Sequence, residues 1–205
     1  RPRSAEDVPL PLPPEWPPYY GEKPFSEPET QAVRDFVMSH RNIATGFDTH
    51  SGCQLILYPW GDTLTHCPDY KTYKYLGRIY GEMTGYRDMQ SSLLYPVYGG
   101  AEDWMYGNQS IIYFTNELFG PKWQIGWGGW NQWPKYYPDA WKPWVDFSHP
   151  TLGPVQIGGE WLFRYYNPPE NEIVSWAQKN LPMILSLAEV TPKMEVTDVS
   201  IESPK

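Results

Sequence analysis

The sequence lacks the features that mark membrane proteins and nucleic-acid-binding proteins. None of its apolar runs approaches the roughly 18 residues of a membrane-spanning helix, so we expect no membrane span. The 16 Lys and Arg residues are outnumbered by 24 Asp and Glu, which leaves a net charge of -8, and they form no cluster that could bind phosphates. We therefore expect no nucleic-acid partner, and a neutral or cationic ligand suits this charge better.

Cysteine is also scarce. The two cysteines, Cys53 and Cys67, flank a turn-rich loop. A disulfide between them would fit an extracellular or periplasmic protein, but two unpaired thiols fit the sequence equally well. A zinc site that adds His66 is less favoured, because the spacing matches no common tetrahedral pattern.

Proline and tryptophan, by contrast, are abundant, with 23 and 11 residues. Residues 1–24 carry eight of the prolines and are expected to form an extended segment. Six of the tryptophans lie in residues 119–149, a Gly- and Pro-rich stretch that interrupts the pattern of helices and strands. We expect these indoles to pack an irregular loop onto the body of the protein; a wall beside a binding cleft is the alternative.

A first helix is predicted from residue 26 to about residue 40. Ser26 and Glu29 have the spacing of a capping box, in which each side chain bonds the other residue's backbone amide. Residues at helical spacing are expected to face the core: Val33, Phe36, Val37 and His40. This helix leads into a strand that ends near His50.

Helix and strand signals then alternate as far as residue 190. A second helix begins at Pro68-Asp69, and its expected inward positions are Tyr73, Leu76, Tyr80 and Met83. The remaining predicted elements are a strand at 91–95, a helix at 101–106, a strand at 110–118 and a helix at 169–190. The alternation predicts an α/β fold with helices on both faces of a sheet.

Two residues at strand ends have the chemistry of a metal-dependent hydrolase. His50 ends a probable strand, where an imidazole is held with little freedom and can bind zinc. Glu117 lies in the apolar run 111–118, where a carboxylate can act as a general base. Taken alone, His50 fits a structural histidine better than a ligand, and Glu117 fits a solvated carboxylate as well as a base.

Several segments resemble zinc carboxypeptidases of the A/B type, in order and at consistent spacing. They are Ser26-Glu27-Pro28-Glu29-Thr30, His50-Ser51 followed by Gln54-Leu55-Ile56-Leu57-Tyr58-Pro59, Tyr95 followed by Gly99-Gly100-Ala101-Glu102-Asp103-Trp104-Met105-Tyr106, and Thr115 with Glu117. His149-Pro150-Thr151-Leu152-Gly153-Pro154-Val155-Gln156-Ile157-Gly158-Gly159 resembles a segment of bacterial-type members that carry an extra C-terminal β domain. The resemblance implies a mixed, mostly parallel sheet with helices on both faces.

The same resemblance implies a domain organisation. Residues 25–190 would be the C-terminal half of a peptidase domain, with an insertion at 119–149. Residues 191–205 would begin a truncated C-terminal β domain or a linker.

The resemblance also implies how the parent protein would hydrolyse peptides. His50 would be one ligand of a single Zn²⁺ ion, which lowers the pKa of its bound water. Glu117 would be the general base that takes the water proton and passes it to the leaving amine. The substrates implied are peptide or protein C-termini.

Four further residues would bind the substrate. Tyr95 would close over its terminal carboxylate. Glu102 would lie at the base of the specificity pocket, where its charge would favour a basic C-terminal residue. A solvated carboxylate that turns away or pairs with a neighbour is the alternative for Glu102. Leu57 and Thr115 would line the same pocket.

The chain also departs from the family pattern. It holds no His-x-x-Glu, which supplies the other two zinc ligands, and no upstream Asn and Arg residues to clamp the substrate. We therefore expect a fragment cut at both ends that lacks the N-terminal half of its domain, binds zinc weakly and has negligible activity alone. Gly52 replaces a tyrosine of pancreatic relatives, which predicts more open outer subsites. The parent is expected to be extracellular or periplasmic.

A function from another class also fits the sequence. The chain could be a noncatalytic peptide- or glycan-binding module on a carboxypeptidase-like fold, with the tryptophan-rich insertion as its contact surface. Glu117 discriminates between the two, because a noncatalytic module has no reason to keep an acid in that strand.

Overall fold

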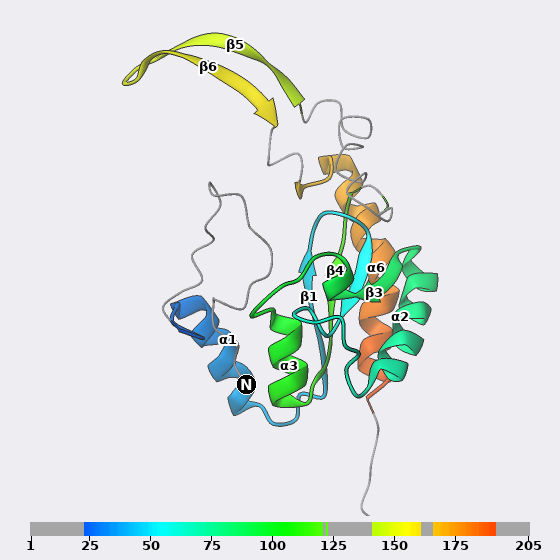
Figure 1. Cartoon of the computed structure of the whole chain (residues 1–205). Coiled ribbons are helices and arrows are strands. Elements are labelled where there is room, and N and C mark those ends of the chain that lie inside the picture. The colour runs from blue at the N-terminus through cyan, green and yellow to red at the C-terminus, as the bar shows by residue number, and fades with distance from the viewer. Residues whose placement is uncertain (1–22, 121, 123–140, 161–165, 192–205) are drawn as a thin grey trace, which may run out of the picture.

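A computed structural model describes residues 23–120, 122, 141–160 and 166–191 (Figure 1). Its centre is a sheet whose strand order is β1-β4-β2-β3. The strands are β1 (Thr45–His50), β2 (Leu55–Tyr58), β3 (Arg87–Gln90) and β4 (Ile112–Glu117). β1 pairs with β4 in parallel, as β2 does with β3, whereas β2 and β4 are antiparallel. The predicted mixed, mostly parallel sheet is confirmed.

Helices cover both faces of this sheet. The main ones are α1 (Pro28–Ser39), α2 (Tyr70–Thr84), α3 (Ala101–Gln109) and α6 (Ile173–Glu189), with short 3₁₀ turns at η2 (Ser91–Leu93) and η5 (Glu170–Glu172). Helices α2 and α6 lie together on one face, while α3 and α1 lie toward the other (Figure 1). No helix in the described parts of the chain is long and apolar enough to cross a membrane.

The main core fills the space between the sheet and helices α2 and α6. Its centre is Phe114 of β4, which is fully buried. The Phe114 ring makes edge contacts with Tyr73 and Tyr80 of α2, at centroid distances of 5.2 and 5.3 Å. Met183 and Leu187 complete the core from α6. Aromatic contacts therefore pack α2 against the sheet, and Met183 and Leu187 pack α6 against it.

The predicted inward stripe of α2 is confirmed at three of its four positions. Tyr73, Leu76 and Tyr80 are buried, but Met83 is 42% exposed. Thr84 is buried instead of Met83, because the stripe continues four residues beyond Tyr80. The Thr84 hydroxyl donates a hydrogen bond to the Tyr80 carbonyl.

Helix α1 differs from the prediction at its start and on its inward face. It begins at Pro28 without a capping box, because the Ser26 hydroxyl donates to the Glu27 carboxylate instead. Val37 is buried against Met105 and Ile111. The other predicted inward residues are exposed, namely Val33, Phe36 and His40. In the described part of the chain, α1 buries only a narrow strip.

The strand predicted at 91–95 is wrong. β3 ends at Gln90, whose side-chain amide donates to the carbonyls of Trp60 and Thr63. Ser91 begins the turn η2, and its hydroxyl donates to the Tyr58 carbonyl. These bonds satisfy the polar groups of the loop after β2, so the chain turns there instead of extending the ladder.

Two other predicted boundaries shift. The helix predicted at 101–106 continues to Gln109, and the helix predicted at 169–190 is divided into η5 and α6.

A two-stranded hairpin of β5 (Trp141–His149) and β6 (Gly153–Glu160) was not predicted. Two of the tryptophans expected to pack onto the body lie on β5, where Trp141 is 47% and Trp144 is 60% exposed. For these two the packing prediction is wrong, because they point outward from a ribbon that has no covering layer among the described residues. The tryptophans at 123, 127, 130 and 133, the prolines of 1–22 and residues 192–205 lie outside the described part.

The two cysteines are unpaired thiols, so of the two possibilities that the sequence left open, the disulfide is excluded in this structure. Both are buried, but in separate clusters. Cys53 packs with Leu55 and Leu57, whereas Cys67 packs in the main core.

Candidate active site

His50 and Glu117 lie directly opposite each other where β1 and β4 end. The two residues are register partners in the parallel ladder, and Leu55 of β2 is opposite Glu117 on its other side. The His50 Nδ1–H donates to Glu117 Oε2 at 3.2 Å and to the Ser51 carbonyl at 3.0 Å. The fold thus brings together the two residues that the sequence places 67 positions apart.

The two side chains differ in exposure. The Glu117 side chain is 7% exposed, whereas the His50 side chain is 63% exposed. The hydrogen bond to Glu117 raises the pKa of His50 above its ordinary value, and this outweighs the opposite effect of partial burial. A fixed carboxylate thus lies beneath an accessible imidazole.

A second row of residues lies two positions before His50 on β1 and before Glu117 on β4, and two positions after Leu55 on β2. Thr115 of β4 is flanked by Asp48 of β1 and Leu57 of β2. Because side chains alternate along a strand, this row shares a face of the sheet with His50 and Glu117. Thr115 is partly buried, and Leu57 is buried in a small apolar cluster.

Glu102 reaches the same region from the first turn of α3. Its side chain is bounded by two glycines, since a Cβ built on Gly61 or Gly100 would lie 3.1 or 2.8 Å from a Glu102 carboxylate oxygen. Burial raises the pKa of Glu102 to about 7, and the charges of Asp103 and Asp48 add to the shift.

Asp48 and Glu102 lie near each other although they come from different elements. The charge of Asp48 acts on Glu102. Burial is the larger cause of the raised pKa of Tyr113, and both carboxylates raise it further. The pKa of Asp48 is itself raised by burial. A buried carboxylate, Glu102, and a partly buried one, Asp48, therefore share this part of the site.

Tyr95 lies in the loop after η2 and is 45% exposed. Burial of its hydroxyl raises its pKa, and the charges of Glu117 and Glu102 raise it further. Tyr95 is therefore close enough to interact electrostatically with both Glu117 and Glu102.

The sequence analysis did not identify Asp48 as a site residue. For Gly52 it predicted more open outer subsites, but not the contact with Glu117. The signal for Asp48 was its position two residues before His50, which places both on one face of a strand. Gly52 is buried, and a Cβ added there would lie 3.3 Å from Glu117 Oε2. Its absence of a side chain therefore leaves room for that carboxylate.

The described residues do not form a complete zinc site. A catalytic zinc takes three protein ligands and a water molecule. No group of three His, Cys, Asp or Glu side chains within the described ranges is placed to hold a metal ion, and the side chain that His50 bonds is that of Glu117. His50 could supply one ligand, so this part of the chain does not fit the metal by itself.

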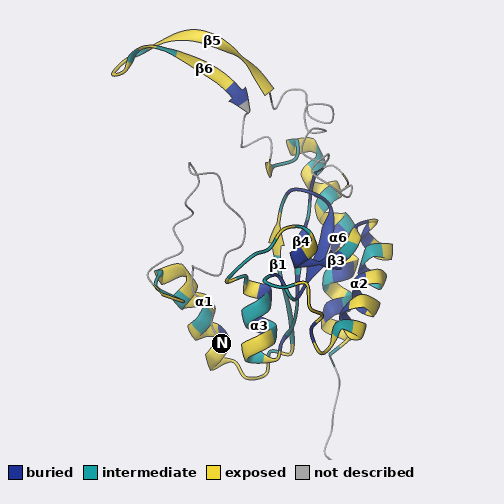
Figure 2. Ribbon diagram, viewed as in Figure 1, coloured by how far each residue is buried: buried dark blue, intermediate teal, exposed yellow. Residues whose placement is uncertain are grey.

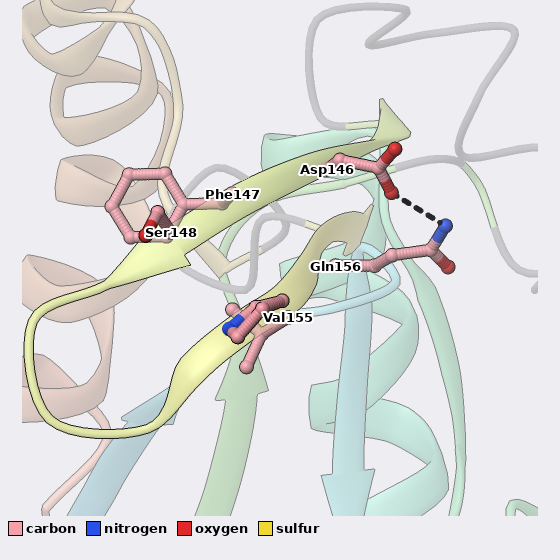
Figure 3. A pocket seen from close by; sticks show the side chains of 6 residues that line it. Asp146, Phe147, Ser148, Val155 and Gln156 are labelled. Atoms are coloured by element: carbon pink, nitrogen blue, oxygen red, sulfur yellow. Dashed lines mark hydrogen bonds between the residues drawn. The ribbon is translucent and has the colours of Figure 1, made fainter.

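A separate shallow hollow lies on the β5–β6 hairpin (Figure 3). It is lined by Asp146, Phe147, Ser148, Pro154, Val155 and Gln156. Its titratable side chain, Asp146, accepts a hydrogen bond from Gln156 Nε2 at 3.0 Å. Asp146 is the one titratable residue among those that line this hollow.

An exposed imidazole against a buried carboxylate, at the end of a mixed sheet between helical layers, is an arrangement suited to a metal-dependent peptidase. A family model described as zinc carboxypeptidase matches residues 11–137. The chain belongs to this family, and membership implies a Zn²⁺ cofactor for the family's complete domain.

Individual relatives agree with this assignment. The chain is 35% identical to mouse carboxypeptidase A4 over 107 residues, which cover 49% of the chain and 26% of that protein. It is 34% identical to zinc carboxypeptidase A 1 of Anopheles gambiae over 110 residues, covering 49% of the chain and 25% of that protein. The chain thus spans about a quarter of the length of these relatives.

The fold has a counterpart among solved structures. Carboxypeptidase A from Helicoverpa armigera superposes with a TM-score of 0.57 over 83% of this chain and 35% of that chain, at 19% identity. At this identity the similarity concerns the fold, and it supports the α/β carboxypeptidase-like architecture.

Proposed function

We propose that the protein containing this chain is a zinc carboxypeptidase, in which Glu117 is the general base and His50 is one zinc ligand. The observation that carries the proposal is the pairing of the two residues across the ends of β1 and β4, with a hydrogen bond of 3.2 Å. Family membership supports it. The complete domain would have to supply the remaining ligands.

The position of Glu117 suits proton transfer. β4 is paired on both sides, so the carboxylate is held by β1 and β2 together. Glu117 would accept a proton as the water oxygen forms a bond to the peptide carbonyl carbon. It would then deliver that proton to the nitrogen as the carbon–nitrogen bond breaks. Tyr95 would donate a hydrogen bond to the substrate's terminal carboxylate.

The preferred substrates in this proposal end in Lys or Arg. Glu102 supplies a buried carboxylate and Asp48 a partly buried one, and a cationic side chain between them would offset the cost of ionising both. Thr115 and Leu57 would line the pocket beside the apolar stem of the substrate side chain. An apolar C-terminal residue would leave both carboxyl groups without a charged partner.

We also propose that the protein is located outside the cytoplasm. It rests on the family resemblance, and the two free thiols lend it no weight. Detection of the protein in the extracellular or periplasmic fraction, and its absence from the cytosolic fraction, would test it.

The test uses the full-length protein and peptides that differ only in a C-terminal Lys, Arg, Phe or Leu. We expect release of Lys and Arg with the higher kcat/KM. For these substrates kcat/KM should rise with pH through about 7, because the ionised form of Glu102 binds the cation. The Glu102→Gln variant should lose this preference.

Two results would contradict the proposal. Equal or faster release of Phe and Leu would refute the role of Glu102 and Asp48. Binding of the peptides without hydrolysis would instead support a noncatalytic binding module.

A further inference from the structure

We propose that Tyr86 and Asn180 are positioning residues that hold Glu117 in place from the opposite face of the sheet. The inference rests on the proposed role of Glu117 as general base. It assigns a catalytic purpose to a buried polar network beneath the site, which packing alone does not require.

Asn180 of α6 is the centre of this network. It is 2% exposed, and its Oδ1 accepts a hydrogen bond of 3.0 Å from Asn116 Nδ2. Its Nδ2 donates to the Tyr86 hydroxyl at 3.0 Å and to the Trp176 carbonyl at 2.8 Å. All of these groups lie on the α6 side, among the apolar residues of the main core.

The network contacts the chain on both sides of Glu117. Asn116 precedes Glu117, and its side chain points to the opposite face because side chains alternate along β4. Leu118 follows Glu117, and its carbonyl accepts a hydrogen bond from the Tyr86 hydroxyl. The Leu118 amide in turn donates to the His50 carbonyl at 2.8 Å. The backbone of Glu117 is therefore fixed from both neighbours, and so is its link to His50.

A neighbouring set of contacts holds the loop after His50. Gln54 has a left-handed backbone with φ of 54°, which is uncommon for a residue other than glycine. Its side-chain amide donates to the Gly120 carbonyl, and its Oε1 accepts from Lys179 at 3.3 Å. The Lys179 ammonium also lies 4.8 Å from the centre of the Tyr86 ring. Helix α6 thus restrains the segments that follow both His50 and Glu117.

Such a network adds stiffness at a cost in stability. Leucine at positions 116 and 180 would satisfy the core without a polar group to desolvate, since exchanging both partners of a buried hydrogen bond for apolar groups is often neutral or stabilising. The hydrogen bonds of the buried network instead restrict its members to one geometry, although Asn116 Oδ1 has no hydrogen-bond partner among the described residues. A general base gains from this, because a displacement of about 1 Å can cost about a hundredfold in rate.

Tyr86→Phe in the full-length protein tests the inference, with Tyr80→Phe as the matched control. Both tyrosines are buried against the same helical layer, but the Tyr80 hydroxyl has no hydrogen-bond partner among the described residues. Tyr86→Phe should lower kcat about tenfold with KM unchanged, whereas Tyr80→Phe should leave kcat within about twofold of wild type. Tyr86→Phe alone should also speed hydrogen exchange at the Leu118 amide.

The outcomes separate this inference from the proposed function. An active wild type with an equally active, fully folded Tyr86→Phe variant overturns the inference and leaves the proposed function intact. Equal losses of kcat in both variants would also overturn it, because the effect would then be one of core packing. A wild type that lacks peptidase activity overturns the proposed function and the positioning role with it.

Discussion

The two faces of the four-stranded sheet differ in composition and burial. The face toward α2 and α6 is mostly apolar and aromatic, with Phe114 fully buried at its centre, and the buried amides of Asn116 and Asn180 are its polar exception. Buried segments gather where the sheet meets these two helices (Figure 2). The opposite face carries the carboxylates of Asp48 and Glu117 beside the exposed imidazole of His50. Strand β4 contributes to both faces, because Phe114 and Glu117 point to opposite sides of it. Alternation along a strand thus separates the residues that stabilise the sheet from those that could do chemistry.

The largest effect on stability is expected on the aromatic face. Phe114→Ala should lower the free energy of unfolding by about 3 to 5 kcal/mol, because it removes a ring packed against three tyrosines. Thr115→Ala is the matched control on the other face and should cost less than about 1 kcal/mol. Urea unfolding of both variants measures the difference, and equal losses would contradict the division between the faces.

Glu102→Gln should change how stability depends on pH. The pKa of Glu102 is raised from 4.5 to about 7, so the folded protein binds this proton more tightly than the unfolded chain. Its contribution is fully present below pH 4.5 and is lost as pH rises through about 7. Between pH 5 and pH 8 the free energy of unfolding, measured with urea, should fall by up to about 3 kcal/mol less in the variant than in wild type. An unchanged decline would show that Glu102 is not the group responsible.

Gly52→Ala should disturb the polar face of the sheet at Glu117 without disturbing the aromatic face. The added methyl group would lie 3.3 Å from Glu117 Oε2, so the carboxylate must shift. We expect kcat of the full-length protein to fall about tenfold. The free energy of unfolding should change by less than about 1 kcal/mol, which distinguishes displacement of the base from loss of fold. Wild-type kcat in this variant would show that the carboxylate tolerates the crowding.

The sequence predicted the aromatic face better than the polar one. Tyr73, Leu76 and Tyr80 follow a local helical period, which can be read without knowing what they pack against. The pairing of His50 with Glu117 depends on a register between distant strands, and only the family resemblance suggested that they meet. The network of Asn116, Tyr86 and Asn180 left no signal, because it forms only when α6 packs across β4.

Errors arose where polar side chains determine the chain path. Gln90 ends β3 by bonding loop carbonyls, although the following residues have the composition of a strand. Ser26 bonds Glu27 in place of a helix amide. The Gln90 bonds join residues far apart in the sequence, and the Ser26 bond is a local alternative to capping, so local helix and strand patterns did not reveal either.

Glu117→Gln in the full-length protein is the decisive test of whether Glu117 is the general base. The substitution keeps the shape of the side chain and removes its ability to accept a proton. We predict that kcat for peptides ending in Lys or Arg falls at least about a thousandfold, with a dissociation constant for the peptide within about threefold of wild type. A variant that retains more than about a tenth of the wild-type kcat would contradict the claim.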